Sequence, residues 1–311
     1  MSAKVFISCG QASDEERIFA QSLGEWLRSE GYVPYVAIEV QSILDLNYGI
    51  IGELKTSDYY IFVNFKREEV HRGTERFRRG SLYTHQELAV AYAIGFERML
   101  LLNQKGAFPE GMQSFMVSNV PEFSEPAEAL ELIRAAIGKA GWRPEYSRHL
   151  SLASLDLGPE ITYYDHASPP RRARVLLATI RNGRSDIGAM QAVARLSSLV
   201  GADGTRRESP DRSHLKATGH SGYSQAILPQ STAVFDLLTI DLNSPSQLYL
   251  NSSHDVVPRA PVIDKPGNYE LLYEVYSSGF PVLRLRVDIE HTGNPKTLRA
   301  RCEGTTNKVR L

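Results

Sequence analysis

Hydrophobic positions in the N-terminal half of the chain form short continuous runs, separated by longer segments with helical spacing. Continuous apolar runs are typical of strands that are buried on both faces of a parallel sheet. Apolar residues three or four positions apart are typical of helices that cover such a sheet. The predicted strands are residues 4–8, 32–38, 58–65, 99–102 and, as a fifth, 115–117.

Polar residues mark where the helices begin. Ser13 is followed by Glu16 at the spacing of a capping box, and this helix carries Leu23 and Leu27 on one face. Further helices are predicted to begin near residues 42, 81 and 124. The alternation predicts a doubly wound α/β domain, which binds ligands outside the carboxyl ends of its strands. The residues at those ends are Ser8, Cys9, Gly10, Ile38, Glu39, Asn64, Phe65 and Lys66.

The hydrophobic pattern changes after Trp142. Residues 142–170 contain four prolines among mixed polar residues, so we predict a linker or bridging segment there. Beyond it, alternating runs are separated by turn residues, most clearly in residues 283–289. The predicted strands are residues 174–180, 191–199, 233–242, 247–250, 269–276 and 282–289. This spacing predicts an antiparallel β-sandwich of immunoglobulin-like kind. The expected domains are therefore residues 1–141 and 171–311, joined by residues 142–170.

Composition and charge give no indication that the protein binds nucleic acid or a membrane. The 311 residues are enough for two hydrophobic cores, and 42% are hydrophobic. The formal net charge of −1 gives no electrostatic reason to expect nucleic acid or an anionic membrane as a partner. No apolar run approaches the roughly 18 residues of a spanning helix. The first residues show no signal-peptide pattern. The two cysteines, Cys9 and Cys302, form no disulfide framework, which favours a cytoplasmic location.

Glu87 is the strongest candidate for chemistry. It lies early on a predicted helix in the α/β half of the chain. A carboxylate in this position can stabilise the positive charge that develops when a sugar–base bond breaks. The same glutamate can also simply complement the dipole at the start of its helix. Spacing alone does not decide between these two roles.

Two stretches of sequence carry a family resemblance. The chain opens with Val5-Phe-Ile-Ser, and Glu87 lies in the run Tyr83-Thr-His-Gln-Glu-Leu-Ala. Together with Ser57-Asp58 before the third predicted strand, residues 3–138 resemble the Toll/interleukin-1 receptor (TIR) domain family. Two departures stand out: Tyr83-Thr84 replaces the usual tryptophan–cysteine pair, and the loop of residues 39–47 lacks the common Gly-Asp or Arg-Pro-Gly signature.

The resemblance implies a flavodoxin-like parallel sheet and a specific reaction. In enzymatic TIR domains the glutamate equivalent to Glu87 cleaves NAD between ribose and nicotinamide, giving ADP-ribose or a cyclic isomer. Bacterial members often act in antiphage defence. NAD is then a substrate, and neither a cofactor nor a metal is expected. Two alternatives stay open: a non-catalytic TIR scaffold for protein assembly, and an enzyme like the nucleoside 2-deoxyribosyltransferases.

The remaining site candidates surround the strand ends. The expected substrate-binding residues are Ser8, Cys9, Gly10, Gln11, Asn64, Lys66 and Tyr83. Gly10 lets backbone N–H groups approach a phosphate or ribose, or else belongs to an ordinary turn. Cys9 is expected to be a packed small residue and not a nucleophile. The charged residues 66–79 form either a flap over the substrate or a solvated surface loop. His214 and His220 have no metal-ligand spacing, so we expect them in loops.

The expected partners follow from this assignment. They are NAD, a second copy of the chain bound through the TIR-like domain, and an unknown ligand or protein at the β-sandwich. A cytoplasmic enzyme that destroys NAD has to be controlled, and the β-sandwich is expected to be the regulatory half.

Overall fold

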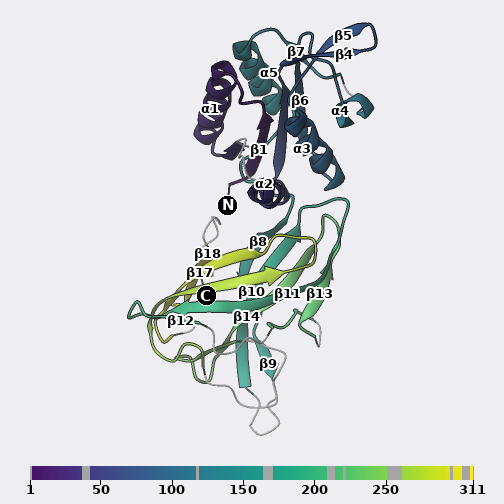
Figure 1. Ribbon diagram of the computed structural model, residues 1–311. Helices are drawn as coiled ribbons and strands as arrows, with labels where there is room; N and C mark the ends of the chain where they lie inside the picture. Colours follow the sequence, from purple (N-terminus) through teal and green to yellow (C-terminus); the bar gives the residue numbers. More distant parts are fainter. Residues whose placement is uncertain are drawn as a thin grey trace. The chain divides into compact units, whose positions relative to one another are not determined.

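The computed structural model describes residues 2–36, 43–116, 119–163, 171–208, 214–219, 222–250, 261–294, 297–302 and 309–310. The chain divides into two compact units, Met1–Ser147 and Arg148–Leu311 (Figure 1). The first unit is α/β with a parallel sheet, and the second is rich in antiparallel strands. The sequence prediction of an α/β part followed by a β-rich part is confirmed at this level.

The first unit is built on a five-stranded sheet. Its order is β2-β1-β3-β6-β7, and every neighbouring pair is parallel. The strands are β1 (Lys4–Cys9), β2 (Val33–Val36), β3 (Tyr59–Asn64), β6 (Met99–Gln104) and β7 (Glu122–Phe123). All residues of β3 are buried, as its continuous apolar sequence predicts.

Helices cover both faces of this sheet. They are α1 (Asp14–Ser29), α2 (Ile43–Thr56), α3 (Leu82–Ala93), α4 (Met112–Phe115) and α5 (Pro126–Lys139). One hydrophobic core joins the sheet to α1 and α5, and the other joins it to α2 and α3. Figure 1 shows α1 and α3 on opposite sides of the sheet. The predicted capping box is present at α1, where Ser13 and Glu16 bind each other's backbone N–H groups.

Two predictions in this unit are wrong in detail. The charged residues 66–79, expected as a loop or flap, contain a hairpin of β4 (Glu68–Arg72) and β5 (Glu75–Arg79). Each strand has one hydrophobic residue at its centre, Val70 in β4 and Phe77 in β5, and these two residues pair across the hairpin. Residues 115–117 were expected to be the fifth strand, but Phe115 ends the short helix α4 and residue 117 lies outside the described residues; the fifth strand of the sheet is β7.

The second unit contains two antiparallel sheets among its described residues. One has the order β15-β14-β10-β8, with β9 also paired to β10, and the other has the order β12-β11-β16-β17-β18-β19, with β13 paired to β11. The first sheet comprises β8 (Leu150–Leu157), β9 (Ile161–Tyr163), β10 (Arg171–Asn182), β14 (Thr232–Asp241) and β15 (Leu248–Leu250). The second comprises β11 (Ala189–Val200), β12 (Arg206–Glu208), β13 (Ser224–Ile227), β16 (Gly267–Tyr276), β17 (Leu283–His291), β18 (Arg299–Cys302) and β19 (Val309–Arg310). Each of the six predicted strands is present.

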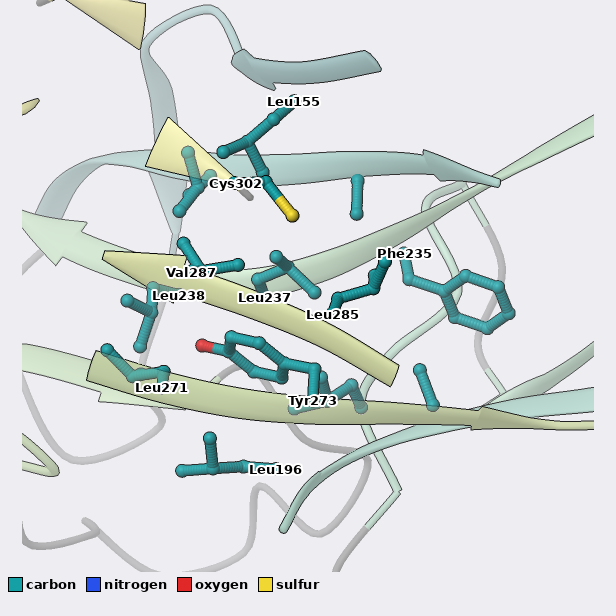
Figure 2. Close-up of a cluster of buried hydrophobic side chains, with 14 of the residues drawn as sticks. Leu155, Leu196, Phe235, Leu237, Leu238, Leu271, Tyr273, Leu285, Val287 and Cys302 are labelled. Carbon is teal, nitrogen blue, oxygen red and sulfur yellow. The ribbon is translucent and has the colours of Figure 1, made fainter. Parts of the chain in front are cut away.

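A single hydrophobic core draws on both of these sheets. Figure 2 shows Leu155, Phe235 and Leu238 from the first sheet together with Leu196, Tyr273 and Leu285 from the second. Cys302 is also buried in this core, whereas Cys9 is buried in the first unit, so the two thiols belong to separate units. Within the described residues, no helix has the length and apolar character needed to cross a membrane.

The segment of residues 142–170, expected as a linker, is divided between the units. Trp142 stacks on Tyr59 with ring centroids 4.1 Å apart, and Tyr146 also packs against Tyr59 at 5.1 Å. These aromatic contacts make residues 142–147 part of the first unit. Strands β8 and β9 then pair with β10 and belong to the second unit. The boundary therefore falls between Ser147 and Arg148.

Candidate active site

The site begins with a contact between a strand end and a helix. Ser8 follows Phe6 and Ile7 near the end of β1, and alternation turns its side chain towards the same face as Phe6, the face covered by α2 and α3. Ser8 Oγ donates a hydrogen bond to Oε2 of Glu87 on α3, at 2.5 Å. Ser8 is completely buried and Glu87 is 8% exposed. The structure thus brings together two of the predicted site residues.

Helix α3 is held over the sheet by its apolar positions. Leu88 and Ala91 are fully buried in the core that α3 shares with β1 and β3. Glu87 precedes Leu88 on the same buried side of the helix. Packing at Leu88 and Ala91 therefore fixes where the Glu87 carboxylate meets Ser8, and the serine hydroxyl satisfies one of its oxygens.

Groups close to Glu87 are kept neutral by burial and by its charge. Burial, and after it the negative charge of Glu87, raises the pKa of the Tyr60 phenol well above its usual range. The same two causes, in the same order, raise the pKa of the Cys9 thiol. Cys9 is only 4% exposed and packs in the core on the opposite face of the sheet, so it is a thiol and not a thiolate nucleophile.

Asn64, at the end of β3, belongs to a buried amide network. Its Nδ2 donates to Asn103 Oδ1 at 2.7 Å and, at 3.4 Å, to Gln113 Oε1. Asn103 in turn donates to the Ala107 carbonyl oxygen. A Cβ atom on Gly80 would lie 1.8 Å from Asn64 Oδ1, so glycine is required where the chain enters α3. The network ties the ends of β3 and β6 to each other and to the segment that follows β6.

The turn after β1 contains an internal ion pair. Arg67 donates two hydrogen bonds to the Glu16 carboxylate, at 3.0 and 2.8 Å. The same carboxylate accepts hydrogen bonds from the backbone N–H groups of Ala12 and Ser13. A Cβ atom on Gly10 would lie 2.5 Å from Arg67 Nη2 and 2.8 Å from Glu16 Oε1. The absence of a side chain at Gly10 thus leaves room for this ion pair. The backbone amides of Ala12 and Ser13, at the start of the helix where a phosphate was expected, bind the Glu16 carboxylate.

The other predicted residues lie further from this contact or outside the described part of the chain. Gln11 is half-buried, and its carbonyl oxygen accepts a hydrogen bond from Arg17. Lys66 is exposed, although its backbone N–H donates to Gln104 Oε1. Tyr83 is 53% exposed on the outer side of α3. Residues 37–42, with Ile38 and Glu39, and residue 220 lie outside the described residues. His214 is described, and its ring stacks on Tyr223.

Sequence reasoning missed His85 and Tyr60. His85 is 6% exposed, its ring lies 5.3 Å from that of Phe62, and neither ring nitrogen has a hydrogen-bond partner among the described residues. Its position three residues before the buried Leu88 places it towards the sheet, which was the available signal. Tyr60 lies two residues before Phe62 on the same face of β3.

Within the described residues, no group of three or more histidine, cysteine, aspartate and glutamate side chains has an arrangement able to hold a metal ion. The sequence matches no protein-family model, and a search among curated proteins also finds no match. The assignment of function therefore depends on the geometry of the site and on the sequence resemblance.

Proposed function

We propose that the first unit is a flavodoxin-like, TIR-type domain that hydrolyses NAD between ribose and nicotinamide, with Glu87 as the catalytic carboxylate. The observation that carries this proposal is the buried hydrogen bond between Ser8 and Glu87 near the carboxyl end of β1. With the hairpin strands set aside, the sheet order β2-β1-β3-β6-β7 reads 2-1-3-4-5, the order of flavodoxin-like folds. Ligands of such folds bind at this edge of the sheet.

The chemistry needs a negative charge beside the ribose. The bond between C1′ and the nicotinamide nitrogen breaks, and its electron pair neutralises the pyridinium ring. The sugar then carries positive charge, which the Glu87 carboxylate stabilises. Water adds to C1′ and loses a proton to give ADP-ribose, whereas attack by an adenine nitrogen gives a cyclic isomer. The hydrogen bond from Ser8 Oγ holds the carboxylate in one orientation during these steps.

Substitution of the carboxylate tests the proposal. Glu87→Gln keeps the side-chain shape and the ability to accept from Ser8, but removes the charge. We expect nicotinamide release from NAD to fall by about 10²-fold or more, while the melting temperature stays close to that of the parent. Glu131→Gln is a matched control, because the same change is made on α5 at a side chain that is 70% exposed. It should leave the rate unchanged.

The same assay separates the alternatives, and it should also be run at high protein concentration, where copies can assemble. If the protein exchanged bases between 2′-deoxynucleosides and left NAD intact, its function would be 2-deoxyribosyl transfer and not NAD hydrolysis. A folded parent that carries out neither reaction, or a Glu87→Gln variant as active as the parent, would overturn the assignment of Glu87 and favour a scaffold.

For the second unit we propose an antiparallel β-sandwich. The support is that the buried side chains of two antiparallel sheets form one shared core. Sheets that pack face to face keep apolar residues on their inner faces and polar residues outside. Strand β17 follows this rule, since its buried and exposed residues alternate without exception.

A further inference from the structure

The outward face of the sheet that contains β17 has a hollow of about 410 Å³. Volumes of this order suit small-molecule ligands. Its lining comes from four neighbouring strands, at the end of β11, the start of β16, the end of β17 and the start of β18. Ile289 and Ala300 turn inward to the hydrophobic core, so the polar neighbours on either side of them project outward into the hollow.

Strand register arranges these polar side chains in two rows across three strands. The first row is Glu270, Asp288 and Arg301, and the second is Asn268, Glu290 and Arg299. Neighbouring strands are about 4.8 Å apart and alternate residues about 7 Å apart, so the rows span about 10 Å by 7 Å. In both rows the carboxylates lie on β16 or β17 and the guanidinium group lies on β18.

Some of these charges are already paired within the protein. Arg286 binds Glu270, and Arg299 binds Glu290 at 3.3 Å. Asp288 and Arg301 face each other in register, yet neither side chain makes a hydrogen bond or an ion pair with another described residue. Glu270 lies directly opposite Asp288, a pair of like charges that is unfavourable in a sheet.

The Asp288 carboxylate and the Arg301 guanidinium, which have no side-chain partner among the described residues, together determine the kind of ligand. A simple cation would be attracted by Asp288 but repelled by Arg301. A simple anion would be attracted by Arg301 but repelled by Asp288. A ligand with both charges satisfies both side chains. We propose that the hollow binds a small zwitterion of the α-amino-acid type, with its ammonium group on Asp288 and its carboxylate on the Arg301 guanidinium. Arginine is suited to this role because its planar group binds a carboxylate through two parallel hydrogen bonds.

The test uses the full chain and calorimetric titration with each of the common amino acids at up to about 10 mM, the range of weak ligands. We expect saturable binding of at least one. Its N-acetyl derivative lacks the ammonium charge, and its decarboxylated amine lacks the carboxylate. Each should bind at least about 10-fold more weakly, because one of the two ion pairs is lost.

Two variants and one control assign the binding to this hollow. Asp288→Asn and Arg301→Gln should each weaken binding at least about 10-fold, and both side chains are exposed, so the fold should persist. Arg284→Gln makes the same charge change on the outward face of β17 but outside the hollow, and it should bind like the parent. Absence of saturable binding would overturn the proposal. Equal binding of the derivatives, or parental binding by both variants, would overturn it as well. None of these outcomes depends on NAD cleavage.

Discussion

His85 is a buried imidazole that the fold keeps neutral. Burial, and after it the positive charge of Arg79, lowers the pKa of His85 from its usual value of 6.5. Its ring packs on Phe62, and both ring nitrogens lack hydrogen-bond partners among the described residues. A neutral ring with unsatisfied nitrogens costs free energy, and a charged ring in the same place would cost more.

Replacement of this ring should stabilise the protein and change its response to pH. Protonation favours the unfolded state as the pH falls below about 6.5, because the unfolded chain then binds a proton that the folded chain does not. His85→Phe keeps an aromatic ring against Phe62 and removes both effects. We expect the free energy of unfolding to rise by about 1 kcal/mol at pH 7, and by more at pH 5. Chemical denaturation at the two pH values measures both changes.

The matched control for His85→Phe is the same substitution at His71, whose side chain is 58% exposed on the hairpin. It should leave stability nearly unchanged at both pH values. A loss of stability in His85→Phe at pH 7 would contradict this account and indicate that the imidazole makes a stabilising interaction.

At the residue scale, the sequence predicted which residues belong to the site but not which of them contact each other. Glu87 was predicted from its motif and Ser8 from its place at a strand end, and the two are hydrogen-bonded. The bond itself depends on which face of β1 Ser8 occupies and on where α3 crosses the sheet. Gly10 was predicted either to let a ligand approach the backbone or to belong to an ordinary turn, and the structure places the ion pair of Arg67 and Glu16 against it. A contact between residues 51 positions apart has no local signal.

Among the elements, the hairpin of β4 and β5 is tied to α1 by the Arg67–Glu16 pair. Arg67 lies directly before β4, and Glu16 lies in the first turn of α1. Burial works to raise the pKa of Glu16, but the hydrogen bonds and charge of Arg67 outweigh it, so the pKa of Glu16 is lowered. A carboxyl group with a lowered folded pKa stabilises the protein above its ordinary pKa of 4.5 and loses that contribution as the pH falls.

Removal of the guanidinium group should weaken this connection. Arg67→Met keeps much of the aliphatic stem but leaves the Glu16 carboxylate, whose side chain is 6% exposed, without its charge partner. We expect the free energy of unfolding to fall by about 2 kcal/mol at pH 7, because hydrogen bonds to charged groups are among the stronger ones. The difference from the parent should shrink as the pH falls below 4.5 and Glu16 takes up a proton, because the charge that Arg67 pairs with is then lost. Urea denaturation across this pH range measures it.

Arg17→Met provides the comparison, because Arg17 pairs with Asp14 on the surface of the same helix, with side chains 53% and 88% exposed, and its other hydrogen bonds, to the Gln11 and Ala12 carbonyl oxygens, are exposed as well. Exposed pairs contribute little, so its effect should stay below about 0.5 kcal/mol. Equal effects of the two substitutions would mean that the Arg67–Glu16 pair behaves as an ordinary surface pair.

The elements that the sequence predicted best are those with an uninterrupted pattern, such as β3 and β17. Strand β8 was not predicted, because its alternation of hydrophobic residues changes register. Leu150 and Leu152 fall on even positions, but Leu155 and Leu157 fall on odd ones. The structure shows the cause, a β-bulge against β10 between the pairs of Thr179 and Ile180 that shifts the alternation by one. A search for strict alternation of hydrophobic and polar residues does not detect a strand whose alternation shifts by one residue at a bulge.

At the scale of the whole molecule, each unit has its own hydrophobic interior. The cores on the two faces of the parallel sheet use residues of the first unit, and the core to which both antiparallel sheets contribute uses residues of the second. Since a domain with its own core can in principle fold alone, the position of the boundary becomes an experimental question. The sequence placed the start of the β-rich part at residue 171, and the structure places it at Arg148.

Two fragments distinguish these boundaries. Residues 148–311 retain β8, which pairs along β10 and buries Leu150 and Leu155 in the core. Residues 171–311 lack β8, which leaves β10 with an unpaired edge and removes two buried leucines, each contributing about 2 kcal/mol. We expect residues 148–311 to melt cooperatively with a β-type circular dichroism spectrum, and residues 171–311 to aggregate or melt at least about 10 °C lower. Substitution of Leu155 by Ala in the longer fragment should lower its melting temperature in the same direction. If the two fragments melted alike, β8 would be dispensable and the boundary near residue 171 would be the better one.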